Sequence, residues 1–309
     1  MSQPGINWCL EDVLSEGAFR IFEAGGFQSA VLLSISGPGL ALELHRRYPA
    51  AHKIGRLYCG GDQFPSDDDL TWWDWYIEQV GDAIEYFQID NESDERCPTV
   101  MPEQYALYWR EIYRHFKAIY PQKKFGFPMP SIKGEQSWEY AKRCRVAIEA
   151  ADWAAERGYW QEEWQMEDWN WGKRYQRTHF EFPDKEIHLA EYGCSAELSE
   201  DERAKQYRRF AESLPAYIRS HNVFIMRPAP TWTVFEVDEN LARAMRMEGP
   251  TMDDSYSIGP GMFEAMDRNA DSPVEDEHYV GDSESWCSGE KGSYMYSLGA
   301  NRVSFSPFV

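Results

Sequence analysis

Short apolar segments alternate with helix-like stretches along the first 250 residues of the chain. Eight of these segments are nearly uninterrupted apolar runs, a pattern typical of strands that are buried on both faces of a parallel sheet. The predicted strands cover residues 5–10, 30–35, 54–59, 86–89, 125–129, 152–155, 187–190 and 223–226.

The stretches between these segments carry apolar residues at helical spacing. In the clearest one, Trp109, Ile112 and Phe116 share one face of a helix that begins near Pro102 and stops at Pro121. The other predicted helices cover residues 13–24, 40–48, a Trp-rich stretch that ends near 83, 138–150, 199–218 and 241–247. The stretch after the sixth strand is instead predicted to be a long aromatic loop that runs through Trp171.

Eight strands with a mean spacing of about 31 residues, seven of them followed by a predicted helix, indicate a (β/α)₈ TIM barrel over residues 1–248, an α/β fold. A doubly wound open sheet is the competing architecture. That fold usually has a Gly-rich phosphate-binding turn after its first strand, and residues 8–12 contain no glycine. Residues 249–309 are rich in Gly, Ser, Asp and Glu, and we expect them to form an acidic, partly ordered C-terminal extension.

Two of the predicted strands end in carboxylates. Asn91 and Glu92 follow the fourth strand, and Glu191 ends the seventh. Because all strand carboxyl ends of a barrel meet at one face, Glu92 and Glu191 are expected at the same rim. Two such carboxylates can cleave a glycosidic bond, with their carboxyl groups about 5–5.5 Å apart in retaining enzymes and about 6.5–9.5 Å apart in inverting ones. The alternative is that Glu92 is a solvated or helix-capping carboxylate and that Glu191 caps a helix or pairs with an arginine.

This arrangement resembles the clan A retaining glycoside hydrolases, (β/α)₈ barrels that include cellulases, mannanases, xylanases and galactanases. Their mark is Asn-Glu at the end of strand four, matched by Asn91-Glu92, and Glu at the end of strand seven, matched by Glu191. The resemblance implies that Glu92 is the acid/base, that Asn91 contacts the sugar 2-hydroxyl and that Glu191 is the nucleophile. It also implies that Tyr159 orients the nucleophile and that Trp232 forms the substrate floor.

The chain departs from the clan pattern at two places. Arg157 stands where many members have a histidine, two residues before the matching tyrosine. No arginine matches the one often found near strand two, and Arg56 in the third predicted strand is the candidate substitute. These departures leave the family within the clan, and therefore the substrate, unassigned.

Aromatic residues point to the kind of substrate. The chain has 13 Trp and 18 Tyr, and several of them gather in short stretches. Flat exposed rings are stacking platforms for sugars, although ordinary core packing explains any single ring equally well. We expect Trp160, Trp171 and Trp232 to line a cleft across the barrel rim, which favours an extended oligo- or polysaccharide.

Charge and composition exclude several other classes of function. A formal net charge of -21 argues against nucleic acid as a partner, and no apolar run is long enough for a membrane-spanning helix. The seven histidines show neither His-x-His nor His-Glu-x-x-His, which disfavours a metallohydrolase, and no metal or other cofactor is expected. We interpret the six scattered cysteines as buried thiols of a reducing compartment, although their even number permits disulfides. Residues 1–7 lack a secretory signal, so we expect a cytoplasmic protein, or a secreted one whose signal was removed.

The sequence therefore favours a retaining glycoside hydrolase that cleaves a β-linked oligo- or polysaccharide with Glu92 and Glu191. Two alternatives stay open: a sugar-binding barrel that has lost catalysis, and a hydrolase of cell-wall glycan. A turnover assay on plant and microbial glycans distinguishes the first alternative from an enzyme.

Overall fold

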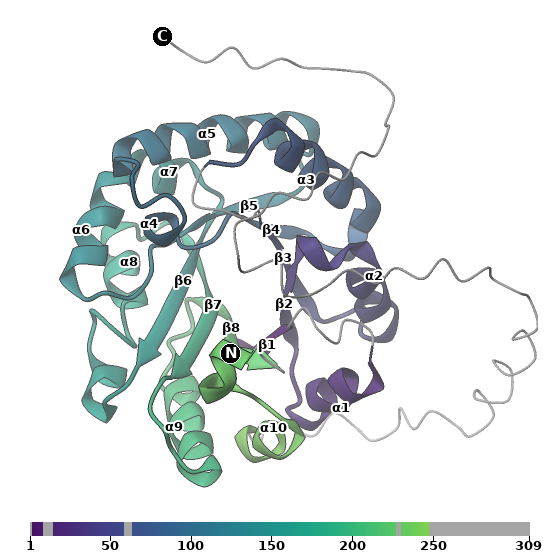
Figure 1. Cartoon of the computed structure of the whole chain (residues 1–309), viewed down its shortest axis with the longest axis vertical. Coiled ribbons are helices and arrows are strands. Elements are labelled where there is room, and N and C mark those ends of the chain that lie inside the picture. The colour runs from purple at the N-terminus through teal and green to yellow at the C-terminus, as the bar shows by residue number, and fades with distance from the viewer. Residues whose placement is uncertain (1, 9–14, 59–63, 227–229, 247–309) are drawn as a thin grey trace, which may run out of the picture. The chain divides into compact units, whose positions relative to one another are not determined.

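A computed structural model describes residues 2–8, 15–58, 64–226 and 230–246 of the chain (Figure 1). Eight parallel strands form one closed barrel in sequence order, and helices follow the strands around its outside, which confirms the predicted (β/α)₈ fold. The predicted extension over residues 249–309 lies outside the described residues.

The strands are β1 Gln3–Trp8, β2 Ser29–Leu33, β3 His52–Leu57, β4 Tyr86–Ile89, β5 Lys124–Pro128, β6 Trp153–Trp160, β7 Glu186–Cys194 and β8 Ile218–Met226. The α-helices are α1 Glu16–Ala24, α2 Pro38–Arg47, α3 Asp67–Val80, α4 Ser93–Arg96, α5 Pro102–Ile119, α6 Glu135–Arg143, α7 Arg145–Ala150, α8 Tyr175–Glu181, α9 Glu200–Glu212 and α10 Glu239–Met245. Short 3₁₀ helices occupy η1 Ser34–Ser36, η2 Gly81–Ala83, η3 Glu163–Glu167 and η4 Pro230–Phe235.

Several helices begin where a short polar side chain caps the first turn. The Ser66 hydroxyl accepts a hydrogen bond from the amide of Asp69, whose carboxylate accepts one from the Ser66 amide in return. The acidic run 67–69 is the first turn of α3, where carboxylates lie favourably near the positive end of the helix dipole. Ser199 caps α9 in the same way by accepting from the amide of Glu202.

Several elements differ from the sequence prediction. β6 continues to Trp160, beyond the predicted end at residue 155, and the short helix α4 was not predicted. The predicted aromatic loop after the sixth strand contains a helix of its own, α8, whose Tyr175 and Thr178 are buried. The helix predicted to continue to Ile218 ends at Glu212, and Ile218 instead begins β8. Ser220 and Asn222, polar but fully buried, hide the apolar pattern of that strand.

The barrel interior has an apolar layer with polar residues on both sides of it. One interior cluster consists of six buried residues from β2 to β7: Val31, Ile54, Tyr86, Trp153, Ala155 and Ala190. Toward the carboxyl ends of the strands, the buried interior residues are charged or polar, among them Arg56, Gln88, Arg157 and Glu191. This polar end of the barrel is where a functional site is expected.

Candidate active site

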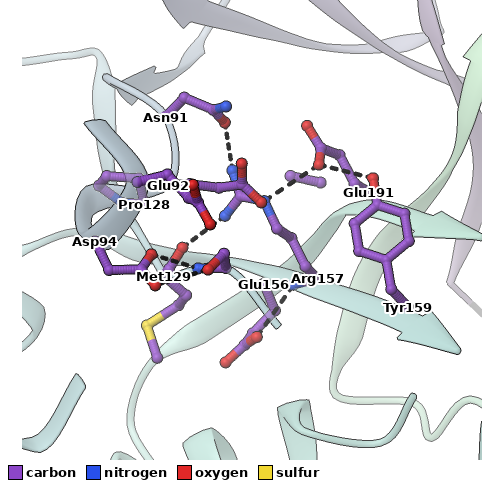
Figure 2. Close-up of polar contacts among 12 residues, drawn as sticks. Asn91, Glu92, Asp94, Pro128, Met129, Glu156, Arg157, Tyr159 and Glu191 are labelled. Atoms are coloured by element: carbon purple, nitrogen blue, oxygen red, sulfur yellow. Dashed lines mark hydrogen bonds and ion pairs between the residues drawn. The ribbon is translucent and has the colours of Figure 1, made fainter. Parts of the chain in front are cut away.

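Glu92 and Glu191 lie together at the carboxyl ends of β4 and β7, where they share a contact with Arg157 (Figure 2). The Arg157 Nε atom lies 3.3 Å from Glu92 Oε1 and 3.2 Å from Glu191 Oε2. These two carboxylate oxygens are therefore at most about 6.5 Å apart, the sum of the two distances. The structure thus brings together the two carboxylates that the sequence singled out, although 99 residues separate them.

A β-bulge directs Glu191 into the barrel. β6 pairs Glu156 with Leu189 but Arg157 with Glu191, so β7 contains one extra residue at this point. Ala190 belongs to the interior apolar cluster, and Glu191 next to it also faces the interior, where it meets Arg157. Without the bulge, alternation along the strand would turn Glu191 toward the surrounding helices.

The end of β4 turns sharply to place Asn91 and Glu92. Asp90 has a φ of 68°, in the left-handed region that non-glycine residues rarely adopt. The Gln88 side chain donates to the Asp90 carbonyl at 2.8 Å, and the Tyr105 hydroxyl donates to Asp90 Oδ2 at 3.2 Å. These contacts hold the turn that carries the two residues at the mouth of the barrel.

Glu191 is held as an anion. The side chain is buried, which alone raises the pKa, but two arginines and a tyrosine outweigh this effect and lower the pKa to about 2. Arg56 donates from Nη1 to Oε1, Arg157 lies at Oε2, and the Tyr159 hydroxyl donates to Oε2 at 2.9 Å. A carboxylate kept ionised in this way has the charge state of a nucleophile.

Glu92 has the opposite tendency. Burial raises its pKa; the charge of Arg157 works against this, while the negative charges of Glu191 and Asp94 add to it, and the net direction is upward. Its side chain is 25% exposed, whereas that of Glu191 is only 5% exposed, so Glu92 is the carboxylate that solvent reaches more easily. Two neighbouring carboxylates with pKa values moved apart are typical of an acid/base paired with a nucleophile.

A buried polar network connects Arg157 with the segment that follows Glu92. Glu156, fully buried on β6, accepts from the Arg157 amide at 3.1 Å and from Arg174 Nη2 at 2.9 Å. Arg174 also donates to the Ser131 carbonyl at 2.8 Å, and the Ser131 amide and hydroxyl both donate to Asp94. The chain of contacts therefore connects the backbone of Arg157 with α4, the helix that directly follows Glu92.

The predicted substrate-binding residues have different positions. Asn91 and Tyr159 are at the site, Asn91 through Arg157 and Tyr159 through Glu191. Trp171 is half-buried in the segment between η3 and α8, and its ring lies beside Gly134, just before α6. Trp232 belongs to η4, after β8, but its side chain lies outside the described residues.

The prediction for Trp160 was wrong. The ring is only 1% exposed and packs against Tyr207 and Phe210 of α9, and its Nε1 donates to Gln206 at 2.8 Å. Because side chains alternate along β6, Trp160 faces the helices while its neighbour Tyr159 faces the barrel interior. Trp160 therefore supports the wall of the barrel and has no free face for a sugar.

Two arginines at the site had been noted only as departures from a pattern. Arg56, the candidate substitute for the arginine near strand two, contacts Glu191 from β3. The sequence carries a signal for Arg56, which is the one charged residue of the predicted strand 54–59, because a charge in a buried strand needs a partner. Arg157 has no such signal, since it lies beyond the predicted strand 152–155 and directly follows Glu156. His188 bonds Ser220 and Glu186 near the amino ends of the strands.

Neither a metal site nor a disulfide is present in the part of the chain that the structure describes. No group of three or more His, Cys, Asp or Glu side chains in that part is arranged to hold a metal ion. Cys97, Cys144 and Cys194 are buried free thiols. Among the described helices, none is both long and apolar enough to span a membrane.

Comparisons with known proteins agree on the fold. No protein-family model matches the chain, and no curated protein matches its sequence. A GH128 (subgroup II) endo-β-1,3-glucanase from Sorangium cellulosum has a TM-score of 0.58 at 13% identity, covering 79% of this chain and 98% of the other. A GH128 (subgroup VI) exo-β-1,3-glucanase from Aureobasidium namibiae gives 0.55 at 14%, covering 77% and 88%. An endo-1,4-β-mannanase from Rhizomucor miehei gives 0.51 at 12%, covering 79% and 92%. At these identities, the similarity establishes the shared barrel fold.

Proposed function

We propose that this protein is a retaining glycoside hydrolase that cleaves a β-linked oligo- or polysaccharide, with Glu191 as nucleophile and Glu92 as acid/base. The observation that carries the proposal is the shared contact of both carboxylates with Arg157 at the carboxyl ends of the strands. Glu92 Oε1 and Glu191 Oε2 are at most about 6.5 Å apart, a bound that includes the short spacing of retaining enzymes and reaches only the lower edge of the inverting range.

The chemistry follows from the charge state of each group. The ionised Glu191 attacks the anomeric carbon while Glu92 gives its proton to the leaving oxygen, and a glycosyl ester forms on Glu191. Water then attacks the same carbon, the ester bond breaks, and Glu92 takes the proton of the water. Asn91 directly precedes Glu92 and contacts Arg157, which touches both carboxylates, and its amide can bond the sugar 2-hydroxyl. The similarity to β-1,3-glucanases and a β-1,4-mannanase makes these glycans the first substrates to test.

Turnover and azide rescue test the proposal. The parent protein should release sugar from at least one β-glucan or β-mannan, and Glu191→Gln should lose this activity by several orders of magnitude. Glu92→Ala should spare aryl glycosides with good leaving groups in the first step, because these need no proton. Added azide should then give the β-glycosyl azide with Glu92→Ala and the α-anomer with Glu191→Gly. If Glu92→Ala and Glu191→Gln both keep the turnover of the parent on a substrate that the parent cleaves, these glutamates are not the catalytic pair.

One observation favours a second candidate, a sugar-binding barrel without catalysis. The ion pair between Arg157 and Glu92 stabilises the ionised form of Glu92, which cannot donate a proton. A sugar-binding barrel should bind a glycan, as measured by calorimetry, and should hydrolyse none of the plant and microbial glycans tested. Hydrolysis that is lost in Glu191→Gln would reject it.

A further inference from the structure

Arg157 is placed unusually for a site of this kind, because its guanidinium lies between the two carboxylates. The side chain is fully buried. Its Nε contacts Glu92 and Glu191, its Nη2 donates to Asn91 Oδ1, and its Nη1 donates to the Met129 carbonyl at 2.6 Å (Figure 2). Every side chain that Arg157 contacts through these nitrogens therefore belongs to the proposed reaction.

The contact with Asn91 fixes the orientation of its amide. A guanidinium only donates hydrogen bonds, so the Asn91 atom that faces Arg157 has to be the carbonyl oxygen Oδ1. The amide nitrogen Nδ2 is then directed away from Arg157. A donor in this position is the form of Asn91 that can bond the oxygen of a sugar hydroxyl.

The charges around Glu92 come from four elements. Arg157 on β6 and Arg56 on β3 favour its ionised form, while Glu191 on β7 and Asp94 on α4 oppose it. In the free protein, the negative charge of Glu191 acts against the effect of the two arginines on Glu92. Once Glu191 is converted to a neutral ester, both arginines act on Glu92 without that opposing charge.

We propose that Arg157 is a positioning residue that switches Glu92 from acid to base between the two steps and that presents Asn91 to the sugar. This inference rests on the proposed function, because it assigns a role within the same reaction. When the ester forms, the uncompensated Arg157 charge holds Glu92 as a carboxylate. That carboxylate then accepts the proton of the attacking water as the ester bond to Glu191 breaks.

The first test needs no catalytic activity. Glu191→Gln imitates the neutral ester, and the Glu92 carboxyl carbon can be followed by ¹³C NMR titration, assigned by comparison with Glu92→Gln. The titration midpoint of Glu92 should lie below the ordinary value for glutamate in Glu191→Gln. Adding Arg157→Gln should raise that midpoint by about 1–3 pH units, and adding Arg157→Lys, which keeps the charge, should not. A midpoint that stays above the ordinary value in Glu191→Gln would overturn the switch, and this single variant leaves Arg157 untouched.

The second test uses turnover of an aryl β-glycoside with a good leaving group. Arg157→Gln should slow the second step about 10-fold or more, so that aryl alcohol appears in a pre-steady-state burst, and Arg157→Lys should show a smaller burst. Arg157→Lys should instead discriminate less than the parent against the 2-deoxy glycoside, since Lys has no second nitrogen for Asn91. Equal bursts in Arg157→Gln and the parent would overturn the proposal. A parent without turnover on any substrate would reject the proposed function, while the NMR titration would still decide the role of Arg157.

Discussion

The buried ion pair between Glu156 and Arg174 offers a direct test of how the fold holds the site. Both side chains are almost completely buried, and Arg174 donates to Glu156 Oε2 from Nε at 3.0 Å and from Nη2 at 2.9 Å. Replacing only Arg174 by Met leaves a buried carboxylate with two remaining donors, Thr178 and the amide of Arg157. Breaking such a pair costs about 3–5 kcal/mol, so the free energy of unfolding of Arg174→Met should fall by that amount.

The double variant distinguishes a charge effect from simple loss of packing. Glu156→Leu with Arg174→Met removes both charges and keeps most of the volume, and such replacements are often nearly neutral. The double variant should therefore be more stable than Arg174→Met alone in urea unfolding. Arg143→Met is the matched control, because Arg143 makes the same two-bond contact with Glu103 on the exposed surface and should leave the unfolding midpoint unchanged. If the double variant loses the sum of the unfolding free energies that Glu156→Leu and Arg174→Met each lose alone, this reasoning is refuted.

Two further predictions concern the rim and the opposite end of the barrel. Trp169, in the segment after β6, is 56% exposed and has the guanidinium of Arg177 against its ring. Trp169→Ala should raise KM for a polysaccharide about 3- to 10-fold, whereas the control Phe180→Ala, on α8, should not change it. Equal KM values for Trp169→Ala and the parent would contradict a sugar platform at Trp169. Burial raises the pKa of Glu186, but bonds from His188 and Tyr86 lower it to about 2, below the ordinary 4.5. Glu186 should thus stabilise the fold above about pH 4.5, by up to about 3 kcal/mol, and this contribution is lost as the pH falls toward 2. When the pH is lowered from 6 to 3, the melting temperature should fall further in the parent than in Glu186→Gln. Equal falls in the two proteins would rule out a stabilising role of ionised Glu186.

The sequence predicted the fold, and it pointed to the two glutamates that the structure brings together at Arg157, because both features leave a pattern in the sequence. Buried parallel strands are continuous apolar runs, and counting them placed Asn91-Glu92 after the fourth and Glu191 at the end of the seventh. The start of β8 left no such trace, since Ser220 and Asn222 are buried polar residues. Helix α8 was missed because its seven residues are too few for a clear helical period.

The contacts within the site depend on geometry that the sequence does not display. The bulge in β7 adds one residue opposite β6, and only the pairing of Arg157 with Glu191 reveals it. Trp160 and Tyr159 are adjacent aromatic residues with the same composition signal, yet strand alternation turns one toward α9 and the other toward Glu191. Arg157 lies between two carboxylates from β7 and from the end of β4 only because the barrel closes, and the sequence does not display this arrangement.

Covalent labelling tests most directly whether Glu191 attacks the anomeric carbon. A 2-deoxy-2-fluoro glycoside with a good leaving group, built on the sugar that the parent cleaves, slows the second step and traps the glycosyl-enzyme. Intact mass should rise by one fluoroglycosyl group, and peptide mapping should place that group on Glu191. Labelling of a residue other than Glu191, or inactivation of Glu191→Gln at the rate of the parent, would contradict the account.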